Sequence, residues 1–93
     1  MLGAHSAAKD ATPEVQAVVD RLKSQVEGQT NKTYSTSKLE KYTTQVVNGL
    51  NYKLKVQVGD GDYIHVHAHR APSAEAEPTL KEVYEGKTAS DSL

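Results

Sequence analysis

The first hydrophobic pattern along the chain is a stripe of apolar residues at helical spacing. Intervals of three and four positions place on one helix face the residues Val15, Val18, Val19, Leu22 and Val26. Thr12 precedes the stripe as a candidate N-cap, and Pro13 suits the first helical position because its missing N–H would have no partner there. Gly28 is placed to end the helix. We therefore predict a helix over residues 12–28 that packs through its apolar face.

Two later stretches alternate between apolar and polar positions, as strands do when one face is buried. The apolar positions of the first stretch are Tyr52, Leu54, Val56 and Val58, and those of the second are Ile64, Val66 and Ala68. Because turn-forming residues 59–62 separate them, the two stretches predict an antiparallel hairpin. Strand-forming residues begin at Leu39, before this hairpin, and residues 79–85 predict a last, edge strand.

Together these elements predict an α+β fold, in which a single helix packs across a four- to five-stranded antiparallel sheet. The length of 93 residues suits one domain over 1–93. Within it we expect an N-terminal trunk over 1–11, the helix over 12–28, the sheet over 39–85 and a polar tail over 86–93.

An apolar pair stands where a polar turn is expected, in the sequence Gln45-Val46-Val47-Asn48-Gly49. Asn-Gly is a strong signal for a hairpin turn. Two adjacent valines at a bend are costly to expose unless a partner docks onto them. We infer that this turn is a binding surface.

Composition narrows the classes of function. A formal net charge of −1 argues against a nucleic-acid binder or a basic membrane-surface protein. The chain has no cysteine, no long apolar run and no signal-like start, so we expect a cytoplasmic protein without disulfides or a membrane span. It also lacks a Gly-x-Ser-x-Gly elbow, a phosphate-binding glycine loop and a His-Glu-x-x-His pair, so we expect neither catalysis nor a cofactor.

Three histidines, His65, His67 and His69, share one face of the second hairpin strand. Such a row could hold zinc or copper, which makes a metal-binding module one alternative function. We favour a solvated polar face without metal, because the expected strand over these residues holds no carboxylate to complete a ligand set. If Lys53 and Lys55 lie opposite, their charge should lower the pKa of the histidines.

The order of helix, strand, Gln-Val-Val-Asn-Gly and hairpin resembles that of the cystatins, and specifically of the stefins, their small cytosolic members without disulfides. The resemblance runs over nearly the whole chain. Further matching stretches are Thr12-Pro13-Glu14, Val18-Val19-Asp20, Asn51-Tyr52, Lys55-Val56 and Val58-Gly59-Asp60.

The resemblance implies reversible, competitive, tight-binding inhibition of papain-like cysteine proteases, such as papain and cathepsins of the L, B and H types. In that family three segments form a wedge that enters the protease cleft without offering a cleavable bond. The trunk would contribute Leu2, Gly3 and Ala4, with Gly3 matching the family's glycine. The first hairpin loop would contribute its Gln-x-Val-x-Gly pattern, here Gln45, Val46, Val47, Asn48 and Gly49. The second would contribute Ala71 and Pro72.

Two residues depart from the family pattern. Asn48 stands where alanine is usual, and Ala71 stands where leucine is usual. They leave open a second alternative, a binding module on the same fold that is retuned to a partner other than a protease. The resemblance also implies an active monomer and a possible domain-swapped dimer, formed when the bent first loop straightens.

Overall fold

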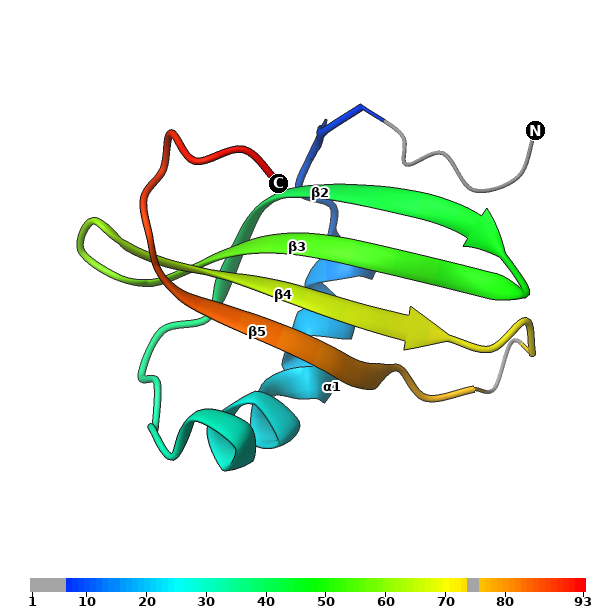
Figure 1. Ribbon diagram of the computed structural model, residues 1–93, viewed down its shortest axis with the longest axis horizontal. Coiled ribbons are helices and arrows are strands. Elements are labelled where there is room, and N and C mark those ends of the chain that lie inside the picture. Colours follow the sequence, from blue (N-terminus) through cyan, green and yellow to red (C-terminus); the bar gives the residue numbers. More distant parts are fainter. Residues whose placement is uncertain (1–6, 74–75) are drawn as a thin grey trace.

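The structure of this protein is a computed structural model, and it describes residues 7–73 and 76–93. One helix, α1 (Pro13–Thr30), lies against one face of a five-stranded antiparallel sheet (Figure 1). The strands follow one another across the sheet in chain order: β1 (Lys9–Asp10), β2 (Lys38–Val47), β3 (Gly49–Gly59), β4 (Asp62–Arg70) and β5 (Thr79–Lys87). This arrangement confirms the predicted α+β class.

The helix begins as predicted but ends later. Thr12 caps it, because its hydroxyl oxygen accepts a hydrogen bond of 3.2 Å from the backbone N–H of Val15. The predicted end at Gly28 is wrong, since the helix continues through that residue to Thr30. Asn31 ends it instead by adopting the left-handed conformation, with φ 58° and ψ 30°. Within the described ranges, no helix is long and apolar enough to span a membrane.

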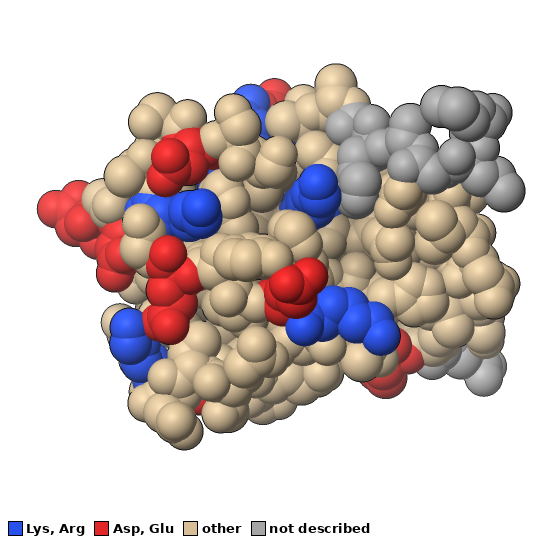
Figure 2. Space-filling model, in the orientation of Figure 1, with Lys and Arg blue, Asp and Glu red and all other residues tan. Residues whose placement is uncertain are grey.

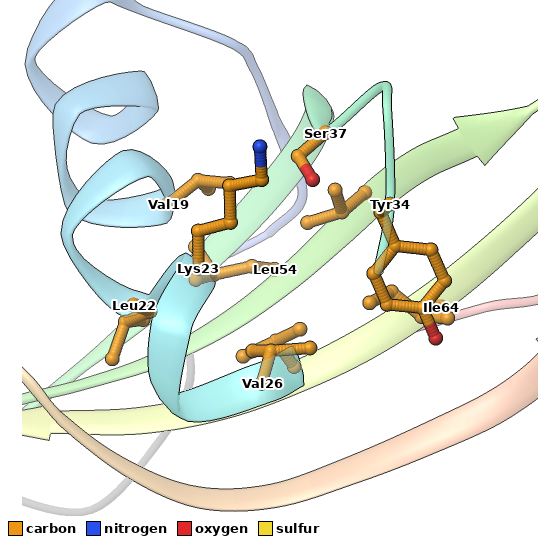
Figure 3. Close-up of a pocket in the computed structure, with 10 residues that line it drawn as sticks. Val19, Leu22, Lys23, Val26, Tyr34, Ser37, Leu54 and Ile64 are labelled. Atoms are coloured by element: carbon orange, nitrogen blue, oxygen red, sulfur yellow. The ribbon is translucent and has the colours of Figure 1, made fainter. Parts of the chain in front are cut away.

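The apolar stripe of α1 is buried, as predicted, against the inner face of the sheet. The largest fully buried side chains are Leu22, Leu39, Leu54 and Val56. Figure 3 shows part of this core, where Val19 and Val26 of α1 come together with Leu54 and Ile64 of the sheet. Tyr34, from the connection after the helix, closes one side of it. Because valine is a mediocre helix former, this packing is what stabilises α1.

Two glutamines fasten the helix to the sheet where strands begin. The side-chain oxygen of Gln16 accepts a hydrogen bond of 2.8 Å from the backbone N–H of Leu39 in β2. The side-chain oxygen of Gln25 accepts one of 3.0 Å from the backbone N–H of Leu80 in β5. Each amide satisfies a backbone donor at the start of a strand, so α1 is held to both β2 and β5.

Both ends of the chain depart from the predicted division, because the sheet extends beyond residues 39–85. Lys9–Asp10, expected within a trunk over 1–11, pairs with β2 as β1. The carboxylate of Asp10 accepts a hydrogen bond of 2.5 Å from the ammonium of its cross-strand neighbour Lys41. β5 runs to Lys87, so its last two residues belong to the sheet and not to a tail over 86–93.

The alternation predicted that the face of the sheet opposite α1 is exposed to solvent along its whole length. Part of this outer face is buried instead. Lys55 and His65 are cross-strand neighbours on this face, and only 8% and 4% of their surface is exposed. Residues 88–93 cross over the outer face at the end of the sheet where β5 finishes (Figure 1). The ammonium of Lys55 donates a hydrogen bond of 2.8 Å to the carbonyl oxygen of Ala89 in that segment. Local alternation could not show this cover, because it comes from a distant part of the chain.

The prediction that all three histidines are exposed to solvent is therefore wrong for His65. Its Nε2 atom is buried and has no hydrogen-bond partner. Burial, and then the charges of Lys87 and Lys55, lower the pKa of His65, which is the direction that the sequence predicted. Among the described residues, no three His, Asp or Glu side chains gather closely enough to hold a metal ion, so nothing favours the metal-binding alternative.

Candidate functional site

The candidate site lies at the end of the sheet where β2 turns into β3 and where the chain leaves β4 (Figure 1). Val47 pairs with Gly49, which leaves Asn48 alone at the bend. Gly49 has a φ of +100°, a conformation that L side chains rarely adopt. The predicted turn at Asn48-Gly49 is therefore present, and its geometry depends on the glycine.

Gly49 also lies very close to the end of β4. A Cβ atom on this glycine would lie 2.1 Å from the carbonyl oxygen of Arg70 and 3.1 Å from Cα of Ala71. Both neighbours are backbone, so they cannot swing aside as a flexible side chain could. The first hairpin turn is thus packed directly against the second loop.

The two valines of the turn do not form a single patch. They are consecutive in β2, so their side chains point to opposite faces of the sheet. Val46 is 60% exposed, more than any other large apolar residue described, and Val47 is half-buried. Ala71 and Pro72 are exposed beside them.

One groove joins the two predicted loops. Its walls come from the first hairpin turn and from the chain at the end of β4: Val46, Val47, Gly49, Leu50, Arg70, Ala71, Pro72 and Ser73. The structure thus brings together two of the three segments that the resemblance implies for the wedge. We call residues 46–49 together with 71–72 the wedge loops.

Polar side chains behind the turn are tied into the sheet. The side-chain oxygen of Gln45 accepts a hydrogen bond of 2.9 Å from the side-chain amide of Asn51. The imidazole Nε2 of His69 lies 2.9 Å from the carbonyl oxygen of Asn48. Reasoning from the sequence missed Asn51 and His69 as parts of this site. The histidine row placed His69 on one face of its strand, but nothing local showed the partner of either residue.

Charge is unevenly spread over the molecule. On the face shown in Figure 2, Lys, Arg, Asp and Glu side chains gather over the middle and over the end away from the wedge loops. The described atoms at the wedge end of this face are uncharged. The groove between the wedge loops also includes the cationic Arg70, so the site as a whole is not uncharged.

The predicted trunk residues Leu2, Gly3 and Ala4 lie outside the described residues. The nearest described segment, Ala7 and Ala8, is exposed. Because β1 is antiparallel to β2, this segment enters β1 from the side on which β2 ends at its turn.

Comparison with known proteins gives consistent matches. A family model described as a cystatin domain matches residues 3–90. Cystatin-A of Homo sapiens is 52% identical over 58 residues, which are 62% of this chain and 59% of that protein. Cystatin-A of Felis catus is 42% identical over 92 residues, 98% of this chain and 94% of that protein. Stefin-3 of Mus musculus is 37% identical over 91 residues, 98% and 88% of the two chains. The human match thus spans less than two thirds of that relative, and the other two span most of theirs.

Proposed function

This chain belongs to the cystatin family, as a stefin-type member, and from that premise we propose that it is a reversible, competitive, tight-binding inhibitor of papain-like cysteine proteases. The observation that carries the proposal is the groove-linked pair of wedge loops, which projects the exposed Val46 beside Pro72 at one end of the sheet. Its partners would be papain and cathepsins of the L, B and H types, and its role would be inhibition and not catalysis.

Nanomolar binding requires the wedge to bury more apolar surface than its two valines provide. Burying a valine side chain contributes roughly 1.5–3 kcal/mol. Nanomolar binding needs about 12 kcal/mol net, after the losses of association. Val46 and Val47 alone therefore fall short, and Ala71 is too small to add much. We propose that Pro72 and the trunk residues 2–4 supply the remaining contact.

We expect the shape of the turn to make this loop resistant to cleavage. The chain reverses direction around Asn48 alone, and Gly49 holds a positive φ. A backbone folded back in this way cannot lie in a cleft as an extended substrate strand. Binding without a cut would leave both proteins intact, so inhibition would be reversible.

A cytoplasmic location belongs to the same proposal. It is supported by the absence of cysteine from the sequence, since cysteine-free chains need no oxidising compartment to fold.

An inhibition titration against papain tests the proposal. Monomeric protein is added to papain with a small fluorogenic substrate, and trypsin serves as the control protease. We expect the apparent KM of papain to rise at nanomolar inhibitor with kcat unchanged, full recovery of activity on dilution, and no effect on trypsin. A folded monomer that leaves papain active would overturn the proposal and would move a retuned binding partner to the front. Inhibition that fades as the chain is cut would overturn the resistance to cleavage.

A further inference from the structure

The last histidine of β4 reaches the first hairpin turn. Nε2 of His69 lies 2.9 Å from the carbonyl oxygen of Asn48, although the two residues are 21 positions apart in the chain. A carbonyl oxygen only accepts hydrogen bonds, so the imidazole Nε2 carries the hydrogen and donates it. A side chain next to the second loop thus holds the backbone of the first.

This contact belongs to a polar row across three strands. Asn51 of β3 lies opposite Gln45 of β2 on one side and opposite His69 of β4 on the other. The side-chain amide of Asn51 donates to the side-chain oxygen of Gln45 at 2.9 Å. The row therefore crosses the outer face of the sheet directly behind the turn, and His69 is the member that reaches forward to the bend.

The contact from His69 acts on a part of the chain that would otherwise open easily. Asn48 is exposed and lies between the two strands, outside both. Chain segments at the exposed end of a sheet are those that open most easily. Ordering a loose loop on binding costs affinity, whereas a loop that is already ordered avoids this cost.

We infer that His69 is a positioning residue for the wedge. Its hydrogen bond fixes the β2–β3 turn against the end of β4, so that residues 46–49 and 71–72 meet a partner as one preformed surface. This inference rests on the proposed function, because the advantage of a preformed wedge is tighter binding to a protease.

Three variants test the inference in the papain titration. His69→Ala removes the donor, His69→Gln keeps a side-chain N–H, and His67→Ala is the matched control on the same strand and face. His67 packs edge-on against the ring of Tyr84 in β5, with ring centres 5.1 Å apart, and so contacts a different strand. We expect His69→Ala to weaken inhibition roughly five- to tenfold, mostly through faster dissociation. His69→Gln should recover part of the loss, and His67→Ala should stay within about twofold of the parent.

A second measurement needs no protease. Backbone ¹⁵N relaxation reports the order of the amides of Asn48 and Gly49 in each variant. We expect lower order parameters in His69→Ala, unchanged ones in His67→Ala, and melting temperatures close to that of the parent for both.

The two measurements separate two kinds of failure. If the parent leaves papain active, the proposed function fails, and the order of the turn alone decides whether His69 positions it. If the parent inhibits and His69→Ala inhibits equally well, the positioning role is overturned, whatever the relaxation shows. Unchanged order at Asn48 and Gly49 in His69→Ala overturns it as well.

Discussion

At the scale of single residues, Gly49 carries the strongest constraint on the proposed wedge. It combines a φ of +100° with a backbone oxygen, that of Arg70, where a Cβ would have to lie. Gly28 is its opposite within the same chain, since it sits in α1 with nothing within 4 Å of its missing Cβ. The two positions therefore form a natural pair for substitution.

We expect Gly49→Ala to lower the free energy of unfolding by roughly 1–3 kcal/mol, because the turn must both strain and shift. Papain inhibition should weaken with it. Gly28→Ala should instead stabilise the protein by roughly 0.5–1 kcal/mol, because alanine favours the helix. Urea unfolding followed by circular dichroism measures both. A Gly49→Ala variant as stable and as inhibitory as the parent would show that the close approach to Arg70 is unimportant.

A second prediction at the residue scale concerns the apolar side chain of Val47 in the first hairpin turn. Val47→Asp should abolish papain inhibition and leave the melting temperature nearly unchanged, because a carboxylate at the contact would lose its hydration without gaining a partner. Thr33→Asp, at an exposed position in the connection after α1, is the control and should inhibit normally. Nanomolar inhibition by Val47→Asp would mean that this turn does not contact the protease.

At the scale of elements, the C-terminal segment over residues 88–93 changes the chemistry of the sheet beneath it. It covers the outer face where Lys55 and His65 lie, and Lys55 donates to its backbone. Charged groups from four elements act on His65: Lys87 from the end of β5, Lys55 from β3, Asp91 from the segment itself and, most weakly, His67 from its own strand β4. The first two disfavour a charged imidazole, as burial does more strongly, and Asp91 opposes them.

The lowered pKa of His65 makes stability depend on pH. The unfolded chain takes up a proton near pH 6.5, whereas folded His65 resists protonation until a lower pH. Its contribution to stability is therefore complete above about pH 6.5 and is lost as the pH falls from there through the folded-state pKa.

Urea midpoints between about pH 7.5 and about pH 5 measure this loss. We expect them to fall in the parent and to fall less in His65→Leu, which has no proton to bind. His67→Leu is the control and should follow the parent closely, because the charge of His67 is the weakest of the influences on the pKa of His65. Parallel pH profiles for the parent and His65→Leu would contradict this assignment to His65.

At the scale of the whole molecule, we expect the turn of the proposed site to be also the place where two chains could exchange strands. β2 and β3 pair along their length and are joined by a bend of a single residue, Asn48. If this bend straightened, α1 and β2 of one copy could pair with β3 of another, which is a domain swap. The swapped dimer would have no first hairpin turn and so no complete wedge.

We therefore expect the monomer alone to inhibit papain. Brief partial unfolding at high protein concentration, followed by size-exclusion chromatography, would separate a dimer from the monomer for assay. The dimer fraction should leave papain active, and inhibition should return after it is unfolded and refolded in dilute solution. A dimer as inhibitory per chain as the monomer would show that its wedge loops are intact.

The sequence by itself determined the elements whose signals are local. The spacing of the valines and Thr12 placed the start of α1, and alternation placed the hairpin of β3 and β4. Asn48-Gly49 marked the turn that carries the proposed site. These signals lie within a few residues of one another, so helix and strand periodicity and turn chemistry suffice to interpret them.

The tertiary structure alone decided which groups meet across the chain. It buried His65 near Asp91 of the C-terminal segment, brought the backbone of Arg70 against Gly49, and joined His69 to the carbonyl of Asn48. The partners in these contacts come from segments about 20 or more positions apart, and periodicity contains no information on which distant segments will meet. Burial, a close backbone approach and a cross-strand hydrogen bond are properties of the packed chain, and they follow only after the sheet has assembled.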